Sequence, residues 1–432
     1  MIWDPYVECM DREEIRFLQL ERLREAVSRV YDRVPFYRES FSAAGVKPGD
    51  IQKLEDVQKL PFTVKNDLRD NYPYGLFAVP MQEIVRLHAS SGTTGKPIVV
   101  GYTKRDIETW AELVARLVTM AGVTNDDVAQ ITFGYGLFTG AFGLHYGLER
   151  VGAAIVPAST GNTEKQVMLM QDFGTTALIG TPSYVLHLAE SVAALGIEPL
   201  ELKLRVGLFG SEVWSESMRA QIERAWGIKA TDNYGLSEVM GPGVSGECEL
   251  ANGLHIAEDH FLVEIIDPET GESLDYGQEG EVVITTLTKE GIPLIRYRTR
   301  DISVINTAPC ECGRTSARLR KIGGRTDDML IISGVNVFPS QIESVIMNIE
   351  GVAPHYQIVI GKKGYLDYLE VQVELAQDRF TGSFKDLEEM ENKIRRRLHN
   401  VLSISPRVRL MEPFSIERSV GKAKRIIDNR PK

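Results

Sequence analysis

Hydrophobic positions along the chain follow two periods, and the change between them separates the predicted regions. An amphipathic helix is expected first, with Asp11 as its cap and Ile15, Leu23 and Val27 on one side. Short apolar runs then alternate with stretches of helical period: the runs are 84–87, 128–133, 153–156, 177–179 and 206–209, and the helical stretches include 108–121 and 212–225. This alternation predicts an α/β domain with covered sheets.

The pattern changes near Phe261, where strands follow one another without long helices between them. It predicts an antiparallel β-rich subdomain over residues 260–325. From Asp327 onward, strand-like and helix-like segments alternate again over about 100 residues, which is typical of a small α+β domain. We therefore expect a large N-terminal domain, residues 1–326, and a small, mobile C-terminal domain, residues 327–432.

Charge and composition exclude some classes of protein. The 432 residues carry a formal net charge of −11, which argues against nucleic acid as a partner. Residues 393–432 nevertheless hold twelve Lys and Arg against three Asp and Glu, so this tail is a solvated face or handles a polyanion such as ATP or CoA. No apolar run is long enough to span a bilayer, and the N-terminus is acidic; we expect a cytoplasmic protein without membrane contact.

A loop of suitable chemistry for phosphate follows the first predicted strand. Residues 88–97 read HASSGTTGKP, and their two glycines, four hydroxyls and lysine offer backbone N–H groups, hydroxyl donors and a cation. It is not a Walker A loop, because Ser90 and Pro97 stand where that motif requires Gly and Ser or Thr. A plain surface loop is the alternative. The expected nucleotide contacts are Ser90, Ser91, Gly92, Thr93, Thr94, Gly95 and Lys96.

Five segments occur in the order found in one superfamily: SSGTTGKP (90–97), YGLSE (234–238), RYRTRD (296–301), GRTDD (324–328) and GKAKR (421–425). Together they span nearly the whole chain, which thereby resembles the ANL superfamily of adenylate-forming enzymes. The flanking sequences FGYGLFTGAFG, YGLSEVMGPGV and MLIISGVNVFPSQIE are similar to those of phenylacetate-CoA ligases. The resemblance implies an AMP-forming acid:CoA ligase that uses ATP, Mg²⁺ and CoA on an aryl acid, with phenylacetate expected.

The resemblance also assigns roles to residues. Lys422 is the expected catalytic lysine between the carboxylate and the α-phosphate, and Glu238 the expected ligand of Mg²⁺. Asp301 would accept hydrogen bonds from the ribose, Arg325 would reach the sugar or phosphate, and the ring of Tyr234 would stack on adenine. Without the resemblance, Lys422 reads as an exposed tail lysine and Asp301 as part of a surface ion pair. The remaining expected nucleotide contacts are Gly210, Ser211, Glu212, Asn233, Gly235 and Ser237.

Two further segments have implied roles. Asp327 matches the hinge about which the C-terminal domain of this superfamily rotates, exchanging Lys422 for a CoA-side loop formed by Gly334, Val335 and Asn336. The apolar run after Asp328 departs from the commoner superfamily form but agrees with phenylacetate-CoA ligases. For the acyl group, aromatic residues interleaved with glycines leave room for a flat ring, although hydrophobic core is the alternative: these residues are Phe133, Tyr135, Gly136 and Phe138.

A metal site is also expected. Cys310 and Cys312 have the look of a metal knuckle, although their CxC spacing is tighter than the usual CxxC. Cys248 with His255 supply two more soft ligands, so the four residues could complete a tetrahedral Zn²⁺ site. The alternative is free thiols and a surface histidine, and Cys9 has no evident partner.

Other functions stay open at this point. The aryl acid could be a different one, including an indole acid, and the adenylate could pass to a carrier-protein thiol, an amine or a deazaflavin. A non-catalytic nucleotide-binding protein is a reading of another class, but it would be expected to lack Lys422 or Glu238. A homodimer is possible, and the sequence does not decide it.

Overall fold

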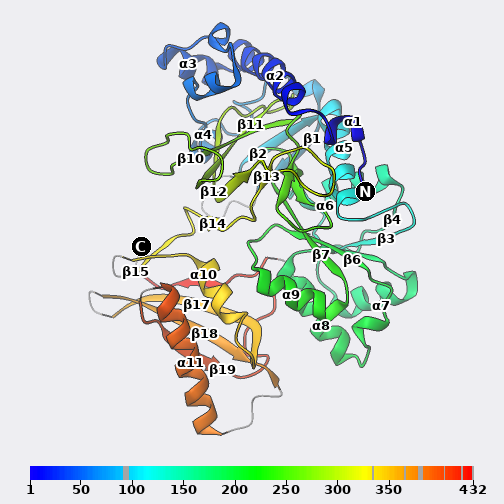
Figure 1. Cartoon of the computed structure of the whole chain (residues 1–432), viewed down its shortest axis with the longest axis vertical. Coiled ribbons are helices and arrows are strands. Elements are labelled where there is room, and N and C mark those ends of the chain that lie inside the picture. Colours follow the sequence, from blue (N-terminus) through cyan, green and yellow to red (C-terminus); the bar gives the residue numbers. More distant parts are fainter. Residues whose placement is uncertain are drawn as a thin grey trace.

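The chain has a large part and a smaller C-terminal part (Figure 1). The structure is a computed structural model and describes residues 1–90, 97–332, 335–363, 366–377, 383–402, 404–419 and 422–430. None of the helices in these ranges is long and apolar enough to cross a membrane.

Nine α-helices of the described chain belong to the large part. The predicted N-terminal helix begins where expected, because the Asp11 side chain accepts a hydrogen bond from Glu13 N, and Ile15, Leu23 and Val27 are buried. The helices are α1 (Pro5–Glu8), α2 (Arg12–Arg33), α3 (Pro35–Ala43), α4 (Lys65–Asp70), α5 (Lys104–Met120), α6 (Gly140–Val151), α7 (Thr163–Phe173), α8 (Pro182–Ala194) and α9 (Glu216–Trp226).

A mixed sheet, twelve-stranded within the described residues, runs through the large part in the order β10-β11-β12-β13-β9-β8-β7-β6-β5-β3-β4, with β14 paired to β12. Strands β4, β3, β5, β6 and β7 are parallel and the rest antiparallel. The strands are β3 (Val128–Ile131), β4 (Ala154–Val156), β5 (Ala177–Gly180), β6 (Val206–Gly210), β7 (Lys229–Leu236), β8 (Gly241–Glu247), β9 (Leu254–Ile256), β10 (Phe261–Ile266), β11 (Glu279–Thr286), β12 (Tyr297–Asn306), β13 (Arg318–Leu319) and β14 (Gly324–Arg325).

The predicted α/β fold class is confirmed, and the buried runs of β5 and β6 explain why their sequence is continuously apolar. The strands after Phe261 are antiparallel as expected, and they are hydrogen-bonded into the same large sheet. A separate hairpin of β1 (Ile84–Ala89) and β2 (Val99–Thr103) flanks the undescribed residues 91–96.

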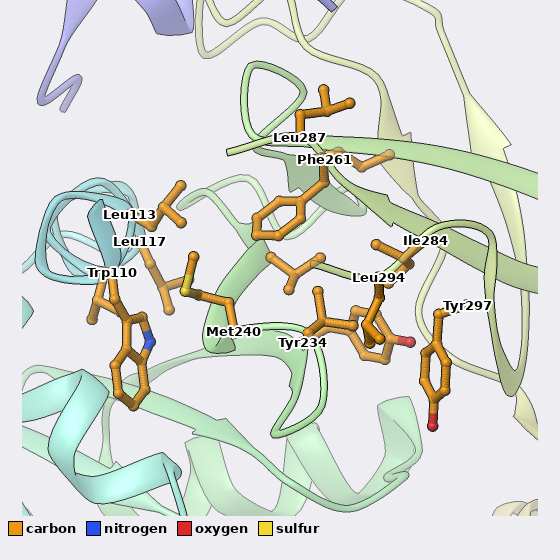
Figure 2. Close-up of a cluster of buried hydrophobic side chains, with 14 of the residues drawn as sticks. Trp110, Leu113, Leu117, Tyr234, Met240, Phe261, Ile284, Leu287, Leu294 and Tyr297 are labelled. Carbon is orange, nitrogen blue, oxygen red and sulfur yellow. The ribbon is translucent and has the colours of Figure 1, made fainter. Parts of the chain in front are cut away.

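A large hydrophobic cluster lies between α5 and the sheet, where Trp110 and Leu113 face Met240 and Tyr234 (Figure 2). Helix α6 approaches α5 closely: a Cβ added to Gly143 would lie 2.4 Å from the Trp110 ring. Glycine is therefore needed there for the two helices to pack. This packing fixes β7 and the turn after it, which carry several predicted site residues.

The C-terminal part is the predicted α+β unit. Its sheet has the order β19-β18-β17-β20, and α11 buries Ile394, Leu398 and Leu402 against it. A hydrogen bond from Ser340 Oγ to Gly323 O and one from Gln221 Nε2 to Met347 O join it to the large part. The elements are β15 (Leu330–Ile332), β16 (Val335–Val337), α10 (Pro339–Ile346), β17 (Val352–Lys363), β18 (Leu366–Leu375), α11 (Phe384–Leu402), β19 (Arg407–Met411) and β20 (Ile426–Asp428).

Candidate active site

A cavity of about 590 Å³ lies between the two parts of the molecule. It opens beyond the carboxyl ends of parallel strands β6 and β7, the place where α/β sheets commonly bind ligands. Both parts contribute to its lining, and most of the described residues that the sequence nominated lie there: Ser90, Phe133, Phe138, Ser211, Glu212, Asn233, Tyr234, Gly235, Ser237, Glu238, Asp301, Arg325 and Lys422.

Lys422 enters this cavity from the C-terminal part. Its side chain is solvent-accessible because it projects into open space, and its Nζ lies 5.6 Å from the centre of the Phe138 ring. The protein around it lowers the pKa of Lys422 by desolvation, while the charges of Glu212 and Glu238 act to raise it. The alternative reading was an exposed tail lysine; Lys422 is exposed, and it also lines the cavity.

Glu238 lies in the turn between β7 and β8 and is only 5% exposed. Its carboxylate is 3.6 Å from Nζ of Lys65 at the start of α4, a contact that the sequence did not predict. Next to it, the Ser237 and Thr139 hydroxyls are 2.9 Å apart. The turn thus presents one buried carboxylate and a hydroxyl pair to the cavity, which suits a hard cation bound to phosphate.

Asp301 forms a buried network on the opposite wall. It is 4% exposed, and its two oxygens accept hydrogen bonds from Tyr234 Oη at 2.7 Å and Arg325 at 3.0 Å. Register explains this pairing, because Asp301 of β12 lies directly opposite Arg325 of β14. Desolvation raises the pKa of Asp301 to about 6, although Arg325 and Tyr234 act to lower it.

The alternative of a surface ion pair for Asp301 is wrong. The neighbouring arginines pair with other acids: Arg296 with Glu264, and Arg298 and Arg300 with Glu281. Arg325 also donates to both oxygens of Asp327, at 2.8 and 3.0 Å. One guanidinium therefore joins Asp301, the carboxylate expected to bind the ribose, to the expected hinge residue Asp327.

The segment after β6, residues 210–212, contacts the backbone next to Lys422 and contributes to the cavity lining. Gly210 ends β6 so close to Asn233 that an added Cβ would lie 2.5 Å from its carbonyl oxygen, and Ser211 has a φ of 71°. Glu212 then accepts hydrogen bonds from Ser183 N at 2.6 Å and from Ala423 N at 3.3 Å. The carboxylate next to the expected adenine site thus contacts the backbone beside Lys422.

The aromatic residues expected around the acyl group divide into two sets. Phe133 and Phe138 line the cavity, together with Leu144. Tyr135 instead lies 3.2 Å from His145 Nδ1 through its hydroxyl and packs edge-on against Phe142. Nothing lies within 4 Å of a Cβ added to Gly136. The apolar wall is therefore narrower than the sequence suggested.

Some nominated residues lie outside the described residues: Ser91, Gly92, Thr93, Thr94, Gly95, Lys96 and Gly334. Val335 and Asn336 fall in strand β16, with only the backbone of Asn336 described. The structure adds cavity-lining residues that no motif indicated, among them Lys65, Trp214, Lys321 and Lys424. Lys65 comes from a segment remote from the motifs, whereas Trp214, Lys321 and Lys424 lie beside or within motif segments but were given no role there.

The four predicted metal ligands also lie together. One side-chain atom from each of Cys248, His255, Cys310 and Cys312 falls within 4.8 Å of the others. The closest pairs are Cys312 Sγ with His255 Nε2 at 3.4 Å and Cys248 Sγ with Cys310 Sγ at 3.9 Å. His255 Nδ1 lies 3.1 Å from Ser316 Oγ, which leaves Nε2 directed at the thiols. Of the alternative, free thiols with a surface histidine, the second half is wrong because His255 is buried, while the thiols are free in this structure.

Comparison with known proteins agrees with this geometry. Residues 24–288 match the AMP-binding enzyme family, and residues 334–430 match the AMP-binding enzyme C-terminal domain. Phenylacetate-coenzyme A ligases from Aromatoleum evansii and Escherichia coli K12 are each 49% identical over 99% of this chain and 97% of their own length. The one from Thermus thermophilus is 48% identical over the whole of both chains.

Among solved structures, 2-hydroxyisobutyryl-CoA ligase in its postadenylation state has a TM-score of 0.94 at 29% identity, covering 99% of this chain and 92% of that one. The same ligase in its thioesterification state has a TM-score of 0.74 at 30% identity, with the same coverage. The predicted superfamily resemblance is confirmed. The chain therefore belongs to the AMP-binding enzyme family and, within it, to the phenylacetate-coenzyme A ligases.

Proposed function

We propose that the chain is an AMP-forming acid:CoA ligase that acts on phenylacetate. Phenylacetate and ATP would give phenylacetyl-adenylate and diphosphate, and CoA would then give phenylacetyl-CoA and AMP. The observation that carries the proposal is the cavity in which Lys422 of the C-terminal part joins Glu238 and Asp301 of the large part. Relatives of nearly equal length named for this reaction support the substrate.

The chemistry explains why these residue types meet. The acid's carboxylate attacks the α-phosphate, a bond forms between them, and the bond to diphosphate breaks. Two anions must approach each other, so the ammonium of Lys422 would lie between the carboxylate and the α-phosphate and stabilise the charge that develops there. AMP is a good leaving group, so the CoA thiolate attacks the carbonyl carbon of the adenylate, the C–S bond forms and the bond to AMP breaks, without a covalent enzyme intermediate.

The large part would hold the nucleotide. Asp301 would accept hydrogen bonds from the ribose hydroxyls, with Arg325 and Tyr234 keeping it oriented, and Ser211, Glu212 and Asn233 would surround the adenine. Residues 90–96 would contact the phosphates. Phe133, Phe138 and Leu144 supply the apolar wall for the phenyl ring.

Mg²⁺ fits the turn after β7. Glu238 is a buried carboxylate that faces the cavity, with Nζ of Lys65 3.6 Å from it, and a carboxylate is a suitable ligand for a hard cation. When bound, the ion would neutralise charge on the ATP phosphates. Lys65 would contribute a second positive charge at the same place.

We also propose that Asp327 is the hinge between residues 1–326 and 327–432. In the second half-reaction the loop around Gly334, Val335 and Asn336 would replace Lys422 and face CoA. The ion pair of Asp327 with Arg325, which itself binds Asp301, supports this assignment, because it connects the sugar site to the junction.

The Cys/His cluster is proposed to hold a structural Zn²⁺. Three thiolates and one imidazole nitrogen within 4.8 Å make a tetrahedral donor set, and the Ser316 contact orients the imidazole ring. It would join the end of β8 to the loop before β13. Metal analysis of purified protein should find about one zinc per chain. Cys310→Ser should lose it and lower the Tm, while Cys9→Ser should keep both; zinc-free wild type would contradict the site.

A substrate panel tests the main proposal. Purified protein is incubated with ATP, Mg²⁺, CoA and one acid at a time, chosen from phenylacetate, hydroxyphenylacetates, indoleacetate, benzoates and fatty acids, and AMP and acyl-CoA are measured together. Both products should form with phenylacetate at the highest kcat/KM. AMP without acyl-CoA would point to another acceptor, and neither product with any acid would refute the substrate class.

A further inference from the structure

An ionic cluster joins helix α8 to the C-terminal part, apart from the residues that line the cavity. Glu190 on α8 accepts a hydrogen bond from His355 Nε2 at 2.7 Å and another from Arg418 Nε at 3.2 Å. His355 lies in β17, and Arg418 follows β19, so both donors belong to the other domain. His187 Nδ1, one turn earlier on α8, lies 3.7 Å from the same carboxylate.

Arg418 ties this cluster firmly to its own domain. Two of its guanidinium nitrogens donate to Glu374 of β18, each at 2.7 Å. The same carboxylate accepts the backbone N–H groups of Phe414 at 2.9 Å and Ile416 at 3.2 Å. Glu374 is 1% exposed, and its hydrogen bonds fix residues 414–418 on the C-terminal domain. Arg418 in turn binds Glu190 of the large domain.

The Glu190 carboxylate is suited to this contact because it is charged. Desolvation acts to raise its pKa, but the nearby His187, the hydrogen bond from His355 and the charge of Arg418 outweigh it, and the pKa lies below its ordinary value. The side chains of His355 and Arg418 are only 11% and 14% exposed, so the pairing is partly shielded from water.

Arg418 precedes Lys422 by four residues, so the ionic cluster attaches the chain just before the proposed catalytic lysine to the large domain. Beyond the lysine, Ala423 N donates to Glu212, and Arg425 lies 3.7 Å from Glu343, which accepts a hydrogen bond from Ser215 N at 2.9 Å. Lys422 is therefore held between attachments on both sides. Glu212 and Glu343 line the cavity, whereas Glu190 is not among its lining residues.

We infer that Glu190 is a positioning residue for the adenylation half-reaction, which latches the Lys422 segment against the large domain and must release it before the thioester forms. The inference rests on the proposed function. The latch belongs to the domain arrangement of the present structure, whose TM-score is 0.94 with the postadenylation form of 2-hydroxyisobutyryl-CoA ligase and 0.74 with its thioesterification form. A contact between domains shifts the equilibrium between two domain arrangements only by the difference between its free energies in them.

The two half-reactions can be measured separately in Glu190→Gln. Phenylacetate-dependent exchange of labelled diphosphate into ATP reports adenylation, and CoA consumption with supplied phenylacetyl-adenylate reports thioester formation. The kcat of exchange should fall roughly tenfold with little change in KM, while the second rate stays within about twofold. Glu198→Gln is the matched control, since Glu198 is exposed just after α8 and has no side-chain partner among the described residues; both rates should equal the wild type.

Hydrogen–deuterium exchange on the full chain gives a readout that needs no substrate. In Glu190→Gln, peptides covering 404–419 should exchange faster than in the wild type, and peptides of β5 and β6 should not change. A wild type without diphosphate exchange would refute the proposed function, and the deuterium data would then decide the latch alone. Equal slowing of both half-reactions, or unchanged exchange of 404–419, would overturn the latch.

Discussion

The two sides of the cavity are held by different kinds of interaction. On the large domain, Glu238 and Asp301 are 5% and 4% exposed and stand on or beside strands packed into the hydrophobic core (Figure 2). On the small domain, Lys422 is solvent-accessible, and its segment is attached through the ion pairs of Arg418 and Arg425. Core packing is cooperative, whereas the ion pairs of Arg418 and Arg425 are separate, partly shielded contacts that can break one at a time. The difference supports the proposal that the nucleotide site is preformed on the large domain and that Lys422 is brought to it by the small one.

The largest effect on adenylation should come from removing the ammonium group of Lys422. Lys422→Ala should lower diphosphate exchange by about 10²- to 10³-fold, because the cation between the two reacting anions is lost. Thioester formation from supplied phenylacetyl-adenylate should stay within a few-fold of the wild type. Lys385→Ala, an exposed lysine of α11, is the control. An equal loss in both half-reactions would show that Lys422 is not confined to adenylation.

A change on the preformed side should affect the nucleotide more than the acid. Glu238→Gln keeps the shape of the side chain but removes the charge proposed to bind Mg²⁺ and leaves Lys65 without its counter-ion. We expect kcat/KM for MgATP to fall by roughly 10- to 100-fold, with partial recovery at high Mg²⁺. The exposed Glu201→Gln should behave as wild type. An unchanged Mg²⁺ dependence would remove Glu238 from the ion's site.

The pH dependence sharpens the comparison further. Desolvation raises the pKa of Asp301 to about 6, so the carboxylate is ionised only above that pH and loses one acceptor oxygen below it. Adenylation should therefore fall by up to about tenfold per pH unit below 6. Asp301→Asn should be slower at pH 8 and lack this acidic limb, whereas the exposed Asp275→Asn should retain it. An identical limb in Asp301→Asn would assign it to another group.

The smallest effect concerns the apolar wall. Tyr135→Phe should change the KM for phenylacetate by less than about twofold, because the hydroxyl meets His145 and the residue is not part of the lining. Phe138→Leu should raise that KM several-fold, since its ring lines the cavity. Steady-state kinetics at saturating ATP and CoA separate the two. A large effect of Tyr135→Phe on the KM would show that Tyr135 contacts the phenyl ring, as the sequence predicted.

Sequence predicted those site residues that lie in motifs. Glu238 and Asp301 are 63 residues apart, and Asp301 and Lys422 are 121 residues apart. Each was nominated from the sequence because its neighbours form a recognisable motif. The fold class was predicted as well, since buried parallel strands such as β6 leave continuous apolar runs. Tyr135 shows the limit, because alternation of aromatics and glycines does not tell which ring faces a cavity.

Contacts between the domains had no counterpart in any local pattern. Glu190 reads as an ordinary polar position of an amphipathic helix, and its partner Arg418 lies 228 residues away. Lys65 contacts Glu238 only because α4 packs beside the turn after β7. Glu212 was nominated for adenine, yet it also binds the backbone of Ala423. Such pairs depend on how distant elements pack, which one sequence without relatives does not record.

The hairpin of β7 and β8 has a consequence beyond the cavity. Its turn carries Glu238, and Cys248 follows directly after β8, so the end of the turn and one strand separate the proposed magnesium ligand from one of the proposed zinc ligands. A strand hydrogen-bonded on both edges transmits displacement along its length more readily than a loop. With zinc bound as proposed, its loss or oxidation of the thiols would therefore disturb the turn that carries Glu238 and slow turnover.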